Sequence, residues 1–199
     1  GLDYSAEVAY QFGDFNDAQD IDQDALGCKL EGGFTFKDAP MSPRPFLGYS
    51  FLEGDDPDTK DKERWDVFYG GWPQFGDMLA WRYVNAPVNN ITEYDATWNE
   101  GSSTPGEAVF SNLQLVTVGL GAKFPLNISA QLSYSWWAAP ETNPGVDDDL
   151  GDYYQLTTKY GYSPNLDFSI YAAMIDAGDA WRTIDDTAYE FYWEAALKF

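Results

Sequence analysis

The last thirteen residues, 187–199, read T-A-Y-E-F-Y-W-E-A-A-L-K-F and carry the clearest structural signal in the chain. Every second residue, counted back from the end, is apolar and usually aromatic, as in Phe199, Leu197, Ala195, Trp193, Phe191 and Tyr189. The positions between them include Lys198, Glu194 and Glu190. Because side chains alternate across a β-strand, the pattern predicts a strand with one apolar and one polar face. It fits either a transmembrane strand or a half-buried edge strand of a soluble sheet.

The same alternation recurs along most of the chain. It predicts about eight strands, at 2–13, 25–37, 46–53, 116–124, 128–136, 154–162, 168–174 and 187–199. The connections alternate between short proline-containing turns and long acidic loops, and the loop cores 14–24, 55–66, 141–149 and 176–186 hold more than half of the 33 acidic residues. Short turns at one end and long polar loops at the other are typical of an outer-membrane barrel.

Aromatic residues distinguish this barrel from a soluble sandwich or lipocalin-like fold, which would also alternate. The apolar face carries them near both ends of the strands, as two aromatic girdles would. They lie at Phe12, Phe51, Trp136, Tyr154 and Tyr189 toward the loops, and at Phe36, Phe124, Tyr162, Phe168 and Phe199 toward the turns. The expected fold is therefore all-β, a transmembrane antiparallel up-and-down β-barrel.

Net charge and the missing histidine restrict the chemistry. A formal charge of −22 disfavours nucleic acid and anionic lipid headgroups as partners. With no histidine, Ser-His and Cys-His nucleophilic sites and imidazole metal sites are excluded. The single cysteine, Cys28, permits no internal disulfide and falls on the apolar side of its strand, where it acts as a small hydrophobe.

Carboxylates remain as candidates for catalysis or metal binding. Glu190 and Glu194 are four residues apart on one strand face, hence ~13 Å, beyond the ~5 to 9.5 Å of two-carboxylate glycosidases. No enzyme and no cofactor are expected. Weak calcium candidates, which lack the spacing of a dedicated loop and fit solvated acidic loops better, are Asp55, Asp56, Asp58, Asp147, Asp148 and Asp149.

One long irregular segment, 54–110, interrupts the alternation. It carries many large aromatic side chains, whose exposure to water would be costly in free energy. Loops of such length are usually functional. One prediction is that the segment folds into the lumen and narrows the pore; the alternative is an extracellular lobe over neighbouring loops. The residues expected to form the constriction are Trp65, Phe68, Tyr69, Trp72 and Trp81.

Several phrases resemble the C-terminal part of the alginate export family of outer-membrane barrels. They are L-D-Y-S-A-E-V-A-Y-Q-F-G at 2–13, G-F-T-F-K-D-A-P at 33–40, P-R-P-F-L-G-Y-S-F-L-E-G-D-D-P at 43–57, G-D-M-L-A-W at 76–81, and the last strand. Family members are longer barrels, so the resemblance implies that 1–199 is either a single barrel domain or a C-terminal barrel half. The family's namesake exports a polyanion through a basic lumen, whereas the inward positions here mix acidic and basic residues.

These observations predict a porin-like channel in the bacterial outer membrane of a Gram-negative organism, passing polar solutes, oligosaccharides or polysaccharide. The alternative is a non-conducting structural barrel whose acidic loops bind a partner or divalent cations. Expected partners are outer-membrane lipid and lipopolysaccharide, the barrel assembly machinery and a small polar solute or saccharide. The terminal strand resembles a barrel assembly signal, with Phe199, Leu197 and Trp193 as its key residues. The predicted pore lining is Glu7, Gln11, Lys29, Glu31, Lys123, Gln131, Lys159, Glu190, Glu194 and Lys198.

Overall fold

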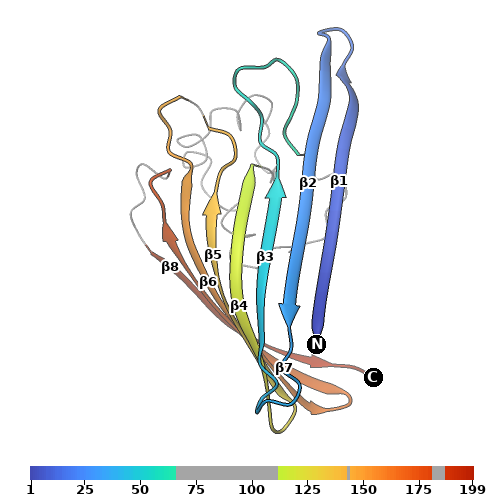
Figure 1. Ribbon diagram of the computed structural model, residues 1–199, viewed down its shortest axis with the longest axis vertical. Helices are drawn as coiled ribbons and strands as arrows, with labels where there is room; N and C mark the ends of the chain where they lie inside the picture. Colours follow the sequence, from blue (N-terminus) through green and yellow to red (C-terminus); the bar gives the residue numbers. More distant parts are fainter. Residues whose placement is uncertain (66–111, 143, 181–186) are drawn as a thin grey trace.

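Eight strands form a single antiparallel sheet, in which neighbours in the chain are neighbours in the sheet (Figure 1). The computed structural model describes residues 1–65, 112–142, 144–180 and 187–199. The strands are β1 (Leu2–Asn16), β2 (Ile21–Phe34), β3 (Arg44–Leu52), β4 (Leu113–Phe124), β5 (Ile128–Ala138), β6 (Asp149–Ser163), β7 (Leu166–Ala177) and β8 (Ala188–Leu197). Within these ranges, no helix is long and apolar enough to cross a bilayer. The predicted all-β, up-and-down architecture is confirmed.

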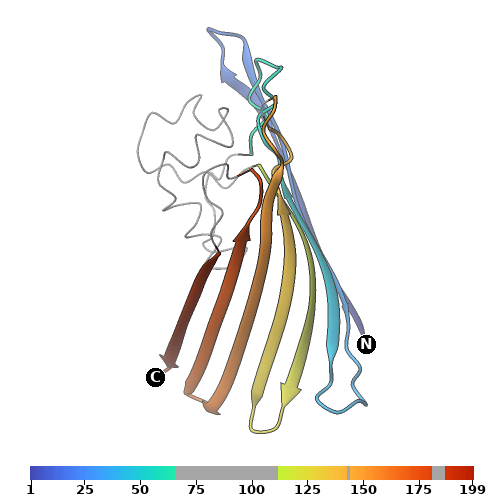
Figure 2. The ribbon, with the colours of Figure 1, turned by 90° about the vertical axis from the view of Figure 1, so that its left-hand side faces the viewer.

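The connections lie at two opposite ends of the sheet (Figure 2). The turns 35–43, 125–127 and 164–165 lie at one end, here called the turn end. The connections after β1, β3, β5 and β7 begin and end at the other, here called the loop end. Successive antiparallel strands impose this arrangement, because every second connection returns to the same end.

The acidic loop predicted at 14–24 is wrong. Strands β1 and β2 continue through most of it and leave only the turn 17–20. Asn16 starts this turn: its carbonyl accepts the Gln19 N–H at 3.1 Å, and its side-chain oxygen accepts the Ala18 N–H at 3.1 Å. Asp20 closes the turn with a φ of 54°, which aspartate tolerates better than most residues. Local turn chemistry therefore outweighs the charge repulsion of the aspartates.

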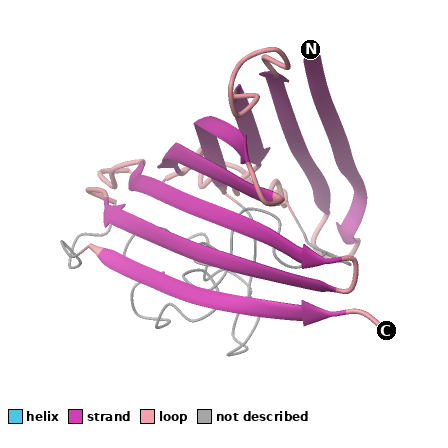
Figure 3. Cartoon of the chain, turned by 90° about the horizontal axis from the view of Figure 1, so that it is seen from below, coloured by secondary structure: helices cyan, strands magenta, loops and turns pink. Residues whose placement is uncertain are grey.

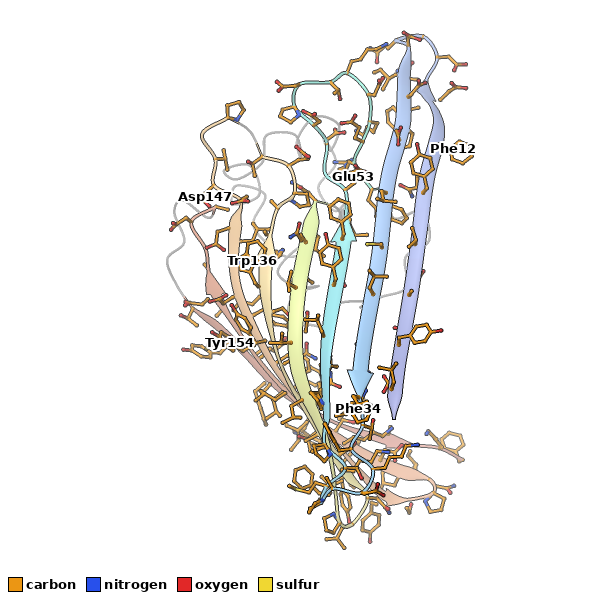
Figure 4. The ribbon with its side chains drawn as sticks, viewed as in Figure 1. Phe12, Phe34, Glu53, Trp136, Asp147 and Tyr154 are labelled. Carbon is orange, nitrogen blue, oxygen red and sulfur yellow. The ribbon has the colours of Figure 1, made fainter. Side chains whose placement is uncertain are left out.

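The two faces of the sheet differ as the alternation predicts. Register aligns Val8, Cys28 and Phe51 on one face, the outer face, and Glu7, Lys29 and Ser50 on the other, the inner face. Large apolar side chains stay exposed on the outer face, including Phe12, which projects away from β1 (Figure 4). Further examples are Leu2, Tyr4, Val8, Leu47, Leu132, Ile170, Tyr189, Phe191 and Trp193. So large an apolar surface suits lipid and not water.

The sheet is curved but not closed (Figure 3). Within the described ranges, β1 pairs only with β2 and β8 only with β7, so these two strands form its edges. Lipid offers no hydrogen bonds to an exposed strand edge, and each unsatisfied group costs several kcal/mol there. In a bilayer, both edges therefore need partner strands.

A β-bulge at the loop end brings β6 close to the connection after β7. The β5–β6 register shifts between Trp137 and Ala138, and Gly151, opposite Trp137, has a φ of 114°. A Cβ at Gly151 would lie 2.0 Å from the Asp176 carbonyl oxygen, so no other residue fits. The close approach lets the Ala180 N–H donate to the Asp149 carbonyl at 2.9 Å. This hydrogen bond joins the connection after β7 to the start of β6.

Candidate pore wall

The inner face collects all the residues that the sequence predicted as pore lining. Lys198, which follows β8, shares the parity of the inner-face positions Ala196 and Glu194 on that strand. The register of the seven strand pairs places on this face Glu7, Gln11, Lys29, Glu31, Lys123, Gln131, Lys159, Glu190 and Glu194. Their shared face is an observation, whereas their role in a pore stays a prediction.

A cavity of about 580 Å³ lies on the inner face in the half next to the turns. Most of its lining residues carry hydrogen-bonding groups, although apolar atoms make up the larger share of its surface, and four of the predicted pore residues contribute. The lining comprises Thr35, Ser42, Arg44, Gly121, Lys123, Ser129, Gln131, Thr157, Lys159, Ser169, Tyr171, Tyr192 and Glu194, together with Ala122, Ala130, Thr158 and Ile170, which the register assigns to the outer face. This size is typical of a pocket for a small molecule.

The sequence-based prediction missed several of these residues. Arg44 was assigned to the proline-containing turn 38–45, although it begins β3 and its parity with Phe46 places it on the inner face. Tyr171 and Tyr192 also line the cavity but were not among the predicted pore-lining residues. Strand parity alone identifies both: each alternates with outer-face residues on its own strand.

Carboxylates pair with three cations of this half, Arg44, Lys159 and Lys198. The Arg44 guanidinium donates to Asp3 and, at 2.9 Å, to Glu31. It also lies over the Phe46 ring, with its carbon 5.3 Å from the ring centroid. The Asp167 carboxylate forms ion pairs with the ammonium groups of Lys159, at 3.5 Å, and of Lys198, at 3.4 Å. The described wall therefore combines these ion pairs with a further cation, Lys123, and a further carboxylate, Glu194, and is not uniformly basic.

The loop half of the inner face is packed with apolar side chains. Trp137 and Leu150 are fully buried, and Leu113 and Ile175 are 1% exposed. The cluster also contains Leu52, Leu115, Ala139, Tyr153, Ala173 and Ala180, and it reaches Tyr171 at the edge of the cavity. Loop residues contribute to it, since Trp65 and Val146 pack against its edge. Loop-end residues cover this part of the wall and exclude water there, although the predicted lining residues Gln11 and Glu190 also lie on the inner face toward the loop end.

The long connection after β3 leaves and rejoins the sheet at one point. The Glu53 carbonyl accepts the N–H of Trp65 at 3.1 Å and that of Asn112 at 3.0 Å. Trp65 lies on the inner face, because a Cβ on Gly27 of β2 would come within 2.9 Å of its ring. Trp65 is the one predicted constriction residue that falls in the described ranges; Phe68, Tyr69, Trp72 and Trp81 lie outside them.

Asn112 ties this connection to the next one. It is fully buried, its amide donates to the Glu141 carbonyl at 2.7 Å, and its side-chain oxygen accepts the Glu141 N–H at 2.9 Å. Gly54 makes room for it, since a Cβ there would lie 2.3 Å from the Asn112 oxygen. The loop end is therefore cross-linked by buried hydrogen bonds.

The pKa values of carboxylates at the loop end are shifted in both directions. Burial raises the pKa of Glu53 and of Glu63 above the usual range of a glutamate. The exposed Lys60 ammonium lies 2.6 Å from the Asp20 carboxylate, which lowers the pKa of Asp20 and raises that of Lys60. Figure 4 shows Glu53 and Asp147 beyond the ends of the strands.

Loop backbone groups use several of the weak calcium candidates. Asp55 accepts the N–H groups of Glu63 and Arg64, and Asp56 that of Asp58. Asp147 and Asp149 accept the N–H groups two residues later. Within the described part of the chain, no group of three or more acidic or cysteine side chains is arranged to hold a metal ion. These contacts make the aspartates part of the loop structure.

The terminal strand presents its predicted signal residues on the outer face. Trp193 pairs with Ile170 and Leu197 with Leu166, and both are about two-thirds exposed. Phe199 follows the strand and is fully exposed. This placement leaves all three accessible, while their role in assembly stays a prediction.

Comparison with known proteins supports the resemblance noted in the sequence. The family model described as alginate export matches residues 1–194, nearly the whole chain. No curated protein matched the sequence. The family consists of outer-membrane β-barrels that act in export, in agreement with the two-faced sheet and its exposed apolar side. The chain belongs to the alginate export family, whose members are transport barrels of the bacterial outer membrane.

Proposed function

We propose that this protein is a porin-like outer-membrane channel that passes polar solutes, saccharides among them, along the inner face of the sheet. The observation that carries the proposal is the cavity of about 580 Å³ on that face, backed by an outer face of exposed apolar side chains. A barrel wall with these two faces stands in lipid and encloses water. The turn half is the wider, wetter section of the channel.

The loop half is the narrow section in this proposal. Trp65 lies against the inner-face cluster, so the start of the long connection is on the side of the lumen. Trp65→Ala would remove a large side chain from that section and raise single-channel conductance. A matched change on the outer face, Trp136→Ala, would leave conductance unchanged.

Conductance of the intact protein in planar bilayers tests the proposal directly. We expect discrete conductance steps that scale with salt concentration, and lower steps for Gln131→Trp, which fills the cavity. The adjacent Leu132→Trp, on the outer face, is the matched control and keeps the wild-type conductance. Folding is checked by heat-modifiable migration on a gel.

The tightly packed loop half favours a second candidate, a non-conducting structural barrel whose loops bind a partner. Full burial of Trp137 and Leu150 is the specific observation behind it. Folded wild-type protein that inserts into bilayers but gives no conductance steps would support this candidate and reject the channel.

A further inference from the structure

We infer that the cavity in the turn half is a binding subsite for a neutral saccharide, with Tyr192 as its stacking surface. This inference rests on the proposed channel and deepens it by assigning a ligand class to one section of the lumen. It is carried by an aromatic pair, a row of polar groups and the balance of charge around them.

The aromatic pair forms a rigid surface. The rings of Tyr171 and Tyr192 stack with their centroids 4.8 Å apart and an angle of 24° between the planes. Tyr171 is 5% exposed, and its hydroxyl lies 2.5 Å from the hydroxyl of Tyr153, so it is held in place behind its partner. Tyr192 is half-buried and lines the cavity. A pre-fixed ring loses little freedom when a ligand packs on it.

Beyond the buried Tyr171, hydrogen-bonding side chains continue across the sheet at Thr157 and Gln131. Tyr192 pairs with Tyr171, Tyr171 with Thr157, and Thr157 with Gln131. Neighbouring strands are ~4.8 Å apart, so the row extends over roughly 14 Å, the length of a short oligosaccharide. A sugar ring has one face of C–H groups and a rim of hydroxyls. An aromatic ring suits the first, and hydroxyl and amide side chains suit the second.

The charges of the subsite favour a neutral ligand over a polyanion. Arg44 is engaged by Asp3 and Glu31, and Lys159 by Asp167. Lys123 and Glu194 add one cation and one carboxylate to the wall, and these two charges are opposite in sign. A carboxylated sugar would have to compete with these carboxylates for the cations, whereas a neutral sugar uses only hydrogen bonds and stacking.

Isothermal titration calorimetry on the intact protein in detergent micelles tests the inference without requiring conduction. The probes are maltotriose, a neutral trisaccharide, and trigalacturonate, which has a carboxylate on every ring. We expect maltotriose to bind the more tightly of the two. Tyr192→Ala should weaken maltotriose binding by about tenfold, whereas Tyr192→Phe, which keeps the ring, should stay within about twofold of wild type.

Two further variants keep the result interpretable. Tyr189→Ala removes an aromatic ring from the outer face of the same strand and should leave maltotriose binding unchanged. Gln131→Leu removes the amide from the far end of the row and should weaken binding by about threefold or more, even if Tyr192→Ala fails to fold. Tighter binding of trigalacturonate, or unchanged maltotriose binding in Gln131→Leu and in folded Tyr192→Ala, would overturn the inference. A conducting channel with no maltotriose binding would reject the subsite and leave the channel intact.

Discussion

The inner face of the sheet is apolar and packed at the loop end, yet polar and hollow at the turn end. Strand β4 shows the change along its own length, from buried Leu113 and Leu115 to Thr117, Gly121 and Lys123. Strand β5 runs the other way, so its inner-face side chains change from exposed Gln131 near the turn end to fully buried Trp137 near the loop end. Position along the strand, and not only the face, therefore decides the environment of a side chain.

Hydroxyl groups mark the boundary between the two halves. Thr117 and Ser135 face each other across β4 and β5, and their hydroxyls lie 2.7 Å apart. Above them the wall is covered by residues of the loop-end connections, among them Trp65 and Val146. Toward the turn end the cavity begins, and Gln131, which lies on β5 four residues before Ser135, is part of its lining. The loop half resembles a protein core and the turn half a solvated channel wall.

The largest difference between the halves should appear on truncation of an inward side chain. Trp137→Ala empties a fully buried site and should lower the free energy of unfolding by about 3–5 kcal/mol. Gln131→Ala, on the same face of the same strand, lies in the exposed turn half and should change it by less than about 0.5 kcal/mol. Denaturant titration in lipid vesicles measures both. Similar costs for the two variants would mean that the halves do not differ in packing.

A charge placed on the outer face should have the next largest effect. Leu132 is 58% exposed on that face, and Leu132→Arg should destabilise the barrel by roughly 2–4 kcal/mol if it meets lipid near mid-membrane. Ile170→Arg, on β7, should destabilise the barrel by a similar amount. Gln131→Arg, one residue away on the inner face, should cost much less because its side chain meets water. Equal costs in vesicle unfolding would contradict the assignment of faces.

Strand number, order and faces could be predicted from the sequence because the period-2 pattern is a local property of side-chain direction. Cys28 and Lys29, for example, lie on the expected outer and inner faces. Packing along the pore axis could not be predicted, since burial of Trp137 depends on loop residues far away in the chain. The turn at 17–20 could not be predicted, because the aspartates of 14–24 indicate a solvated loop, whereas the hydrogen bonds of Asn16 and the positive φ of Asp20 close a tight turn.

A smaller effect should follow from breaking the buried link between loop-end connections. Asn112→Ala removes both hydrogen bonds to the backbone of Glu141 and leaves its N–H and carbonyl without these partners. We expect a loss of about 1–3 kcal/mol in unfolding free energy. Asn127→Ala is the matched control, because Asn127 also has a positive φ (58°, against 52° at Asn112) but its exposed side chain makes only a longer hydrogen bond of 3.4 Å to the Gly161 carbonyl, so it should cost less. Equal losses would show that the loop end gains nothing from this link.

In the turn half, replacing the cation of the Arg44 ion pairs should lower the free energy of unfolding by a smaller amount. Arg44 has a side chain 24% exposed and contacts Asp3 and Glu31, which are 47% and 37% exposed. Arg44→Lys keeps the charge but loses the forked geometry, and should cost about 1 kcal/mol or less. The cost should shrink further in high salt, where such half-exposed pairs are screened. A salt-independent loss above that of Asn112→Ala would show that this half is as rigid as the loop half.

The smallest expected effect is a pH dependence at Glu53, which lies just beyond β3 at the loop end. Burial raises its folded pKa above the unfolded value, although the Leu26 N–H, which donates to it, partly offsets the shift. The folded state therefore binds the proton more tightly, and the group costs no stability below its unfolded pKa. The penalty grows as pH rises through the folded pKa and is complete above it. Glu53→Gln keeps an acceptor for Leu26 without the charge, so its stability advantage over wild type should increase from pH 4 to pH 7. Unfolding titrations of both proteins at the two pH values measure the change. An advantage that is constant or falls with pH would show that the Glu53 carboxylate is as well solvated as those in the turn half.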